Sequence, residues 1–388
     1  MSSSIDRFSE ARRRPVAFLA LGLGLLVSLL AGLPLAADWS SFRGDSGLSG
    51  RASGKLAEAP QPIWTFEVED GFFATAAIVG DTVYAPGLDG KLYALAATDG
   101  EVRWSYEARS EIKSSPLVDG EVVYFGDESG ALHAVATADG KARWVFEAGA
   151  AITSSPNLAP GCLLFGSYDN YLYCIDPAQG ELRWKVETES YVHGTPAISG
   201  EATLVAGCDG NLRQVRWKDG QQTAATSLGG YAAASPAIAN GIAYVGTFEN
   251  QVLAIDLAAG KTLWTYENPE RQFPYYASAA LADDRLIIAG RDKAVRALRL
   301  ADGSEIWKRS FRARFDASPV LLGDRVFVAG QDGKIQALDL TSGETRWEFD
   351  TGSAFDASPA IAGGYLVIGS ADGVLYTFGP ASTESPAR

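Results

Sequence analysis

Short apolar segments alternate with polar turns along nearly the whole chain after residue 37. Residues 114–147 show one complete unit: four such segments, separated by turns that include Asp119-Gly120 and Asp139-Gly140. Asp-Gly between alternating segments predicts β-hairpins, because both positions tolerate a positive φ. No stretch after residue 37 keeps a helical period, so the pattern predicts an all-β chain.

The unit repeats with a marker, a glycine four residues ahead of a tryptophan. The marker pairs are Gly100/Trp104, Gly140/Trp144, Gly180/Trp184, Gly260/Trp264, Gly303/Trp307 and Gly343/Trp347. Gly220 keeps the phase, but Ala224 stands at the tryptophan position, and Trp64 opens the series without a glycine. Steps of 40 residues, with one of 43 between Trp264 and Trp307, are typical of β-propeller blades.

Counting the third segment of each unit predicts eight blades. These segments begin near Lys91, Ala131, Tyr171, Asn211, Gln251, Ala294, Lys334 and Val374. The last unit has no tryptophan strand, whereas the first tryptophan strand, residues 63–68, has no blade ahead of it. The N-terminal strand is therefore expected to pair into the last blade and close an eight-bladed propeller over residues 63–379, which removes the exposed sheet edges.

Residues 337–347, Ala-Leu-Asp-Leu-Thr-Ser-Gly-Glu-Thr-Arg-Trp, resemble the tryptophan-docking repeat of PQQ-type (quinoprotein) propellers. The resemblance covers residues 63–378 and implies that each tryptophan stacks between blades in a structural girdle. The segment from Trp39 to Gly44, followed by Gly47 and Gly50, resembles a leader found ahead of PQQ-like propellers in bacterial envelope proteins. In size and simplicity the chain is similar to BamB-like envelope propellers.

The first 37 residues are expected to direct export. Three arginines, residues 12–14, precede an uncharged stretch that ends in small residues near Ala36 and Ala37, which is typical of a signal peptide. If it is not cleaved, the 23-residue stretch of residues 15–37 is long enough to anchor the chain in the inner membrane. Both alternatives place the propeller outside the cytoplasm, in the periplasm or cell envelope. Residues 38–62 form an N-terminal extension, and residues 380–388 are expected to be a disordered tail.

The formal net charge of −14 argues against nucleic acid as a partner. We expect a monomer that binds another envelope protein and contacts the membrane only through an uncleaved leader. Cys162 and Cys174 face each other across one hairpin. They allow a disulfide, but the favoured interpretation is two small reduced core residues, with Cys208 left free.

The innermost segments begin at a Ser/Thr-Pro pair in most units, and the residue three places before the proline should face the central channel. This series is Phe73, Lys113, Thr153, His193, Ala233, Tyr276, Asp316 and Asp356. The residue before each of them should pack between blades.

The channel series predicts a candidate ligand site of Lys113, His193, Tyr276, Arg314, Asp316 and Asp356. Lys113 or Arg314 would bind an anionic group, and the two aspartates would hold a cation or act as a base. The alternative is that these are ordinary polar residues of a water-filled rim. No Cys/His spacing predicts a transition-metal site.

Three functions remain open. The favoured one is a non-catalytic scaffold that binds another protein, with no catalytic residue and no cofactor. The second is a small-molecule or sugar-binding propeller that uses Tyr191, Tyr231 and Tyr276 as stacking surfaces. The third is a PQQ-dependent dehydrogenase with PQQ and calcium, for which the chain lacks the adjacent cysteines and channel tryptophan that the resemblance would imply. The insertion at residues 267–275 is a lip over the channel, a partner-binding ridge or a neutral loop.

Overall fold

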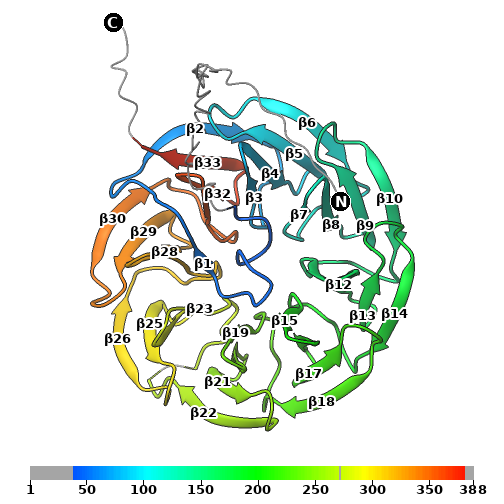
Figure 1. Cartoon of the computed structure of the whole chain (residues 1–388). Coiled ribbons are helices and arrows are strands. Elements are labelled where there is room, and N and C mark those ends of the chain that lie inside the picture. The colour runs from blue at the N-terminus through cyan, green and yellow to red at the C-terminus, as the bar shows by residue number, and fades with distance from the viewer. Residues whose placement is uncertain (1–37, 271, 381–388) are drawn as a thin grey trace, which may run out of the picture. The chain divides into compact units, whose positions relative to one another are not determined.

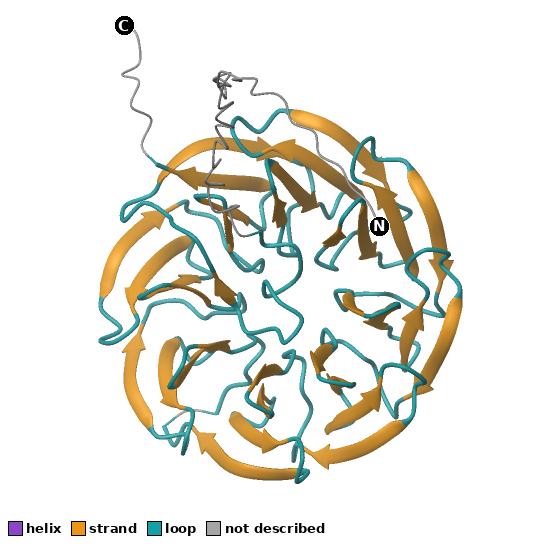
Figure 2. Ribbon diagram, viewed as in Figure 1, coloured by secondary structure: helices purple, strands orange, loops and turns teal. Residues whose placement is uncertain are grey.

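A computed structural model describes residues 38–270 and 272–380 as β-strands joined by turns, with no helix among them. The strands form eight sheets around a central axis (Figure 2), and each sheet is one blade of the propeller. The all-β, eight-bladed prediction is therefore confirmed. The predicted leader, residues 1–37, and the tail after residue 380 lie outside the described residues.

Each blade is an antiparallel meander that runs from a short innermost strand to the outer rim (Figure 1). Blade 1 contains β3 (Ala77–Val79), β4 (Thr82–Pro86), β5 (Lys91–Ala96) and β6 (Val102–Glu107). Blade 2 contains β7 (Leu117–Asp119), β8 (Val122–Gly126), β9 (Ala131–Ala136) and β10 (Ala142–Glu147). Blade 3 contains β11 (Asn157–Ala159), β12 (Cys162–Gly166), β13 (Tyr171–Ile175) and β14 (Leu182–Glu187). Blade 4 contains β15 (Ala197–Ser199), β16 (Ala202–Ala206), β17 (Asn211–Arg216) and β18 (Gln222–Ser227).

The second half of the ring follows the same order. Blade 5 contains β19 (Ala237–Ala239), β20 (Ile242–Gly246), β21 (Gln251–Asp256) and β22 (Lys261–Glu267). Blade 6 contains β23 (Ala280–Leu281), β24 (Arg285–Ala289), β25 (Ala294–Arg299) and β26 (Glu305–Ser310). Blade 7 contains β27 (Val320–Leu322), β28 (Arg325–Ala329), β29 (Lys334–Asp339) and β30 (Thr345–Asp350). Blade 8 contains β31 (Ala360–Ala362), β32 (Tyr365–Gly369) and β33 (Val374–Gly379).

The N-terminal strand β2 (Gln61–Glu67) closes the ring as the outermost strand of blade 8. It pairs antiparallel with β33, from Gln61 opposite Gly379 to Glu67 opposite Val374. Figure 1 shows this blue strand beside the red one, which joins the two ends of the propeller. The predicted closure is confirmed: β2 covers the outer edge of β33 and gives blade 8 four strands like the other blades.

The tryptophan series forms the predicted girdle between blades. The indole N–H of Trp104 donates to the carbonyl of Thr137 in the next blade, at 2.8 Å. Its ring lies against Gly140, where an added Cβ would approach within 2.8 Å. An equivalent hydrogen bond to the next blade, and an equivalent glycine against the ring, recur for Trp64, Trp144, Trp184, Trp264 and Trp307. The marker glycine is thus required by the indole of the preceding blade as well as by its own positive φ.

The girdle has a gap at blade 4, where Ala224 replaces the tryptophan. Gln214, which lies opposite Ala224 in the β17–β18 pair, donates from Nε2 to the carbonyl of Leu257 in blade 5, at 2.9 Å. At six other seams an indole N–H makes this bond. The facing Gly260 has no indole against it, because the nearest atom to an added Cβ would be Thr226 Oγ1 at 3.8 Å. Gln214 therefore keeps the hydrogen bond between the blades but does not replace the ring.

Residues 39–58 form a strap that runs past the innermost strands of several blades (Figure 1). Trp39 exchanges backbone hydrogen bonds with Ile78 of blade 1, and the carbonyls of later strap residues accept N–H groups from blades 2, 4, 5, 6 and 7. The donors are Val118, Ile198, Ile238, Leu281 and Leu321. The strand β1 (Arg51–Ala52) then pairs parallel with β27. The strap thus satisfies backbone groups that the innermost strands would otherwise leave unpaired.

Arg43 anchors the strap from within. Its side chain is buried, and Nη2 donates to the carbonyl of Ala279 in blade 6, at 3.0 Å. Burial lowers the pKa of Arg43 to about 9. A Cβ at Gly50, whose φ is +68°, would lie 1.9 Å from Arg43 Nη2. The glycine is therefore needed both for its φ and for the space that the guanidinium occupies.

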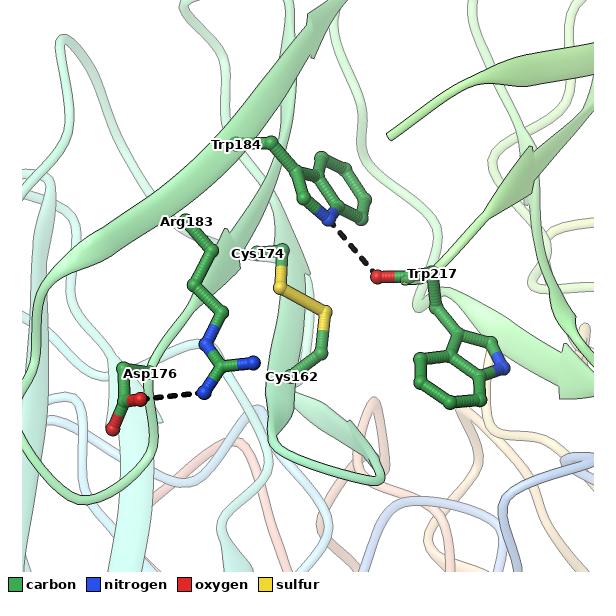
Figure 3. Close-up of a disulfide and its surroundings, with 6 residues drawn as sticks. All are labelled: Cys162, Cys174, Asp176, Arg183, Trp184 and Trp217. Carbon is green, nitrogen blue, oxygen red and sulfur yellow. Dashed lines mark hydrogen bonds and ion pairs between the residues drawn. A yellow bond between two sulfur atoms is a disulfide. The ribbon is translucent and has the colours of Figure 1, made fainter. Parts of the chain in front are cut away.

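Cys162 and Cys174 are joined by a disulfide, with their Cα atoms 5.3 Å apart. The favoured prediction of two reduced core residues is wrong. The cysteines lie on β12 and β13 of blade 3 and face Trp184 and Trp217 at the seam with blade 4 (Figure 3). Cys208 is free, as predicted.

Buried polar pairs hold the turns between the second and third strands. In blade 2, Asp127 accepts a hydrogen bond from Ser129 Oγ at 2.6 Å and contacts His133 Nε2 at 3.0 Å. Burial opposes ionisation of Asp127, but these hydrogen bonds and the Ala131 N–H outweigh it and lower the pKa to about 2.

Within residues 38–270 and 272–380, no helix has the length and apolar character needed to cross a bilayer.

Candidate functional site

A ring of hydroxyl groups surrounds the axis where the innermost strands begin. The backbone N–H of Thr75 donates to Ser115 Oγ of the next blade, at 3.0 Å. The same bond links Ser115 to Ser155, Ser155 to Thr195, Thr195 to Ser235, Ser235 to Ser278, Ser278 to Ser318 and Ser318 to Ser358. Seven of the eight seams between blades are thus tied at the axis by a side-chain hydroxyl, which gives a physical reason for the Ser or Thr at this position of the unit.

The eight loops that enter the innermost strands form one face of the propeller, which we call the mouth face. The residue predicted to pack between blades is buried in every loop: Phe72, Ile112, Ile152, Val192, Ala232, Tyr275, Phe315 and Phe355. All eight residues of the predicted channel series line one axial cavity of about 250 Å³, together with the hydroxyl ring. Phe42 of the strap also lines this cavity, so the strap lies at its base and the mouth face at its opening.

Two arginines bind the carboxylate of Asp316. Arg291 Nε lies 2.5 Å from Oδ1, and Arg314 Nε lies 3.2 Å from Oδ2. The Arg291 guanidinium also lies over the ring of Tyr276, 3.5 Å from its centroid, where a cation–π attraction favours it. Both oxygens of Asp316 are therefore engaged by charges from the protein itself.

The remaining charged residues of the cavity are also paired. Lys113 Nζ lies 2.9 Å from Glu111 Oε2 and 3.4 Å from Glu128 Oε2. Burial disfavours the charged amine, but the two carboxylates outweigh burial and raise the pKa of Lys113. Asp356 Oδ1 accepts a hydrogen bond from Gln331 Nε2 at 2.7 Å.

His193 lies against Tyr168, whose hydroxyl is 2.7 Å from Nδ1. Burial lowers the pKa of His193, which favours the neutral imidazole at neutral pH. The Tyr168 ring stacks on Tyr191 with centroids 4.9 Å apart. His193 thus contacts the ring and hydroxyl of Tyr168 and the hydroxyl of Thr153, without a carboxylate partner among its contacts with the described residues.

The structure brings five of the six predicted site residues together on the cavity wall: Lys113, His193, Tyr276, Asp316 and Asp356. Arg314 does not line the cavity, but it pairs with Asp316. Ligand binding by this group stays a prediction. In the part of the chain that the structure describes, no three His, Cys, Asp or Glu side chains are placed to hold a metal ion.

Sequence reasoning missed three partners of the channel residues, which come from the turns between the second and third strands. Tyr168 contacts His193, Arg291 contacts Asp316, and Gln331 contacts Asp356, each 25 residues apart. The turn of one blade thus reaches the channel residue of the next blade. An alignment of the turns of the eight units would have revealed this constant separation of 25 residues, and with it the partners of these three channel residues. Phe42 had no such signal, because the strap lies outside the repeat.

The predicted insertion at residues 267–275 leads into blade 6 at the mouth face. Asn268 is buried and donates to Asp292 Oδ2 at 2.8 Å, and its carbonyl accepts from Asn250 Nδ2 at 3.0 Å. Phe273 is exposed, whereas Tyr275 is buried. The insertion therefore has an anchored base and an exposed aromatic tip beside the channel.

Comparison with solved structures shows the same fold at low sequence identity. BamB from Moraxella catarrhalis is 19% identical, with a TM-score of 0.71, over 84% of this chain and 99% of that chain. The quinohemoprotein alcohol dehydrogenase ADHIIG from Pseudomonas putida HK5 is 14% identical, with a TM-score of 0.77, over 91% and 82%. A europium-containing methanol dehydrogenase is 11% identical, with a TM-score of 0.73, over 88% and 98%. No curated protein matches the chain.

The dehydrogenase resemblance implies PQQ, but the cavity residues do not fit that cofactor. Neither an adjacent cysteine pair nor a tryptophan lines the cavity, and Cys162 and Cys174 are bonded to each other inside blade 3. The charged groups on the wall are already paired with neighbouring side chains. We therefore derive no redox step from this site.

The family comparison covers the whole propeller. The model for the family described as outer membrane protein assembly factor BamB matches residues 55–162, 148–272 and 271–384. These matches include every blade and the closing strand β2. The chain therefore belongs to the PQQ-like β-propeller family described as outer membrane protein assembly factor BamB.

Proposed function

We propose that this protein is a non-catalytic propeller, exported to the cell envelope, that docks another envelope protein on its mouth face. It acts as a monomeric scaffold without a cofactor. Residues 1–37 direct export, either as a signal peptide or as an anchor in the inner membrane. The envelope assignment draws on the description of the family to which the chain belongs.

One observation carries this proposal. The exposed large aromatic side chains of residues 38–270 and 272–380 are Phe73, Tyr191, Tyr231 and Phe273, and all four lie in loops of the mouth face. Exposed aromatic residues gathered on one face are typical of protein-binding surfaces, whose central contacts are enriched in Tyr, Trp and Phe. The other exposed large apolar residues, such as Leu182 and Leu263, are scattered over outermost strands.

The charge pairing in the axial cavity supports a scaffold over an enzyme. A general base needs a carboxylate or imidazole free to take a proton from a bound substrate. Asp316 is held by two arginines, and Asp356 accepts from Gln331. His193 has a lowered pKa and contacts a tyrosine hydroxyl. Each candidate is already engaged by the protein.

The test is crosslinking in intact cells of the source organism, followed by mass spectrometry of the crosslinked envelope protein. Tyr191→Ala combined with Tyr231→Ala should abolish the crosslink. Leu182→Ala combined with Leu263→Ala is the matched control, because these side chains are 47% and 52% exposed, compared with 52% and 60% for the two tyrosines. An adduct that survives the tyrosine substitutions and disappears with the leucine substitutions would place the docking surface on the rim and refute the proposal.

Cofactor binding is tested separately on the purified protein. Addition of PQQ with Ca²⁺ should leave the melting temperature unchanged, because ligand binding to the folded state raises it by mass action. A saturable rise at micromolar PQQ would overturn the non-catalytic assignment.

A further inference from the structure

The axial cavity lies at the centre of the mouth face, and its size restricts what can enter it. Its volume is about 250 Å³. Cavities for drug-sized ligands begin at about 300 Å³, whereas a dry cavity of about 150 Å³ accepts benzene. The cavity is thus larger than a benzene site and smaller than an ordinary site for a cofactor-sized ligand. One side chain matches this space.

The wall of the cavity favours a neutral occupant. Its charged residues are two cations, Lys113 and Arg291, and two carboxylates, Asp316 and Asp356, so that their charges cancel. Each of them already has a partner on the protein. A charged occupant would have to break one of these pairs, and breaking a partly buried ion pair is costly. An uncharged occupant leaves the pairs intact.

The same wall offers apolar and aromatic surface. Phe42, Phe73, Ala74, Ala233 and the ring of Tyr276 all line the cavity. Phe42 is itself an aromatic side chain that an irregular segment, the strap, brings into the channel from the opposite side. The ring of blades therefore already accommodates an aromatic side chain presented by a loop.

We propose that the axial cavity is a socket for one uncharged aromatic side chain of the docked protein, which enters from the mouth face and packs over Phe42. The inference rests on the proposed docking function and names the chemistry that the partner must present at the centre of the interface. Binding energy in protein interfaces concentrates in aromatic anchors that fill central, desolvated pockets. The exposed Tyr191 and Tyr231 continue the same surface outward from the cavity.

Ala233→Phe tests the socket by filling it. Ala233 lines the cavity, and blades 1 and 6 carry Phe73 and Tyr276 at the same position of the repeat. The blade therefore accepts an aromatic residue there. Ala138→Phe is the control, because Ala138 is an exposed alanine in the turn between β9 and β10, away from the mouth face. Equal melting temperatures of the two variants and the unmodified protein verify folding.

The probes are peptides selected from a random phage-displayed library on the purified full-length chain, then synthesised and measured by isothermal titration calorimetry. We expect the selected peptides to share one aromatic residue. Its replacement by alanine, or the Ala233→Phe substitution in the protein, should weaken binding about tenfold or more, as expected for a hot-spot contact. Ala138→Phe should leave the affinity unchanged.

Three results would overturn the inference, and they differ in what they say of the proposed function. Peptides that lose affinity with Tyr191→Ala and Tyr231→Ala but not with Ala233→Phe would refute the socket and leave docking on the mouth face in place. Failure to select any peptide sensitive to substitutions on the mouth face would refute both. Selected peptides that carry an essential charged residue, rather than an aromatic one, in the cavity would also refute the socket.

Discussion

The tryptophan girdle makes a quantitative prediction at Trp307, which joins blades 6 and 7. Its side chain is buried, with 9% of its surface exposed. The indole N–H donates to the carbonyl of Leu340 at 3.0 Å. The ring covers Gly343, where an added Cβ would lie 2.7 Å from the indole. Because the facing residue is a glycine, it has no side chain of its own to fill the space that the indole would leave.

Trp307→Ala should lower the free energy of unfolding by about 3–5 kcal/mol, the usual cost of truncating a buried tryptophan. Trp307→Phe keeps an aromatic ring and loses the hydrogen bond, which contributes about 1 kcal/mol. Arg285 Nη1 also donates to the carbonyl of Leu340, at 3.2 Å, so this carbonyl keeps a partner in the phenylalanine variant. We therefore expect Trp307→Phe to cost less than half as much as Trp307→Ala.

Urea unfolding followed by circular dichroism measures the effect, and the midpoint should shift without a change in slope. Leu182→Ala is the control. Its side chain is 47% exposed on β14, and surface substitutions of this kind stay within about 0.5 kcal/mol. A loss of less than about 1 kcal/mol for Trp307→Ala would refute the view that indole packing between blades stabilises the ring.

The other predictions concern the girdle gap, a buried carboxylate and the strap. Ala224→Trp combined with Gln214→Ala should restore the missing indole and raise stability by about 1–2 kcal/mol, as cavity-filling substitutions do; an unchanged or lower melting temperature would contradict this. The hydrogen bonds that lower the pKa of Asp127 from 3.8 to about 2 stabilise the fold fully above about pH 4, and this contribution should be lost as the pH falls toward about 2. A pH titration of stability should therefore be flatter for Asp127→Asn over that window, and parallel curves would contradict it. Gly50→Ala should expose the strap to limited proteolysis, because the added Cβ would collide with the buried guanidinium of Arg43. Gly54→Ala is the control and should not increase cleavage, because Gly54 also has a positive φ but no atom lies within 4 Å of its added Cβ. Equal cleavage of both variants would contradict the anchoring role of the Gly50–Arg43 contact.

The repeat itself determined the architecture. Within each unit, turn residues and alternating apolar positions specify four strands locally. The strand at residues 63–68 has no unit ahead of it, and the last unit has no fourth strand after residues 374–379, so each end of the repeat completes the other. The side chains that line the channel were also predictable, because alternation along a strand assigns one face to every second residue. All eight predicted channel residues accordingly lie on the cavity wall.

Contacts between neighbouring blades were not predictable from a single unit. Arg291 meets Asp316, and Gln331 meets Asp356, because the turn of one blade projects over the loop of the next. Gln214 occupies the hydrogen-bonding position of the missing indole because it stands opposite Ala224 across the β17–β18 pair. The disulfide likewise depends on a Cα separation of 5.3 Å across a hairpin, a distance that residue spacing does not specify.

Only the tertiary structure decided the path of the strap. Most of its bonds to the innermost strands are made by backbone groups, which every residue carries, so they leave no mark in the sequence. Local chemistry, repeated eight times, thus determined the blades and their closure. The base of the axial cavity comes from the strap, and Asp316 and Asp356 find partners in the preceding blade. These groups meet only because the closed ring brings the strap and the blades to one axis.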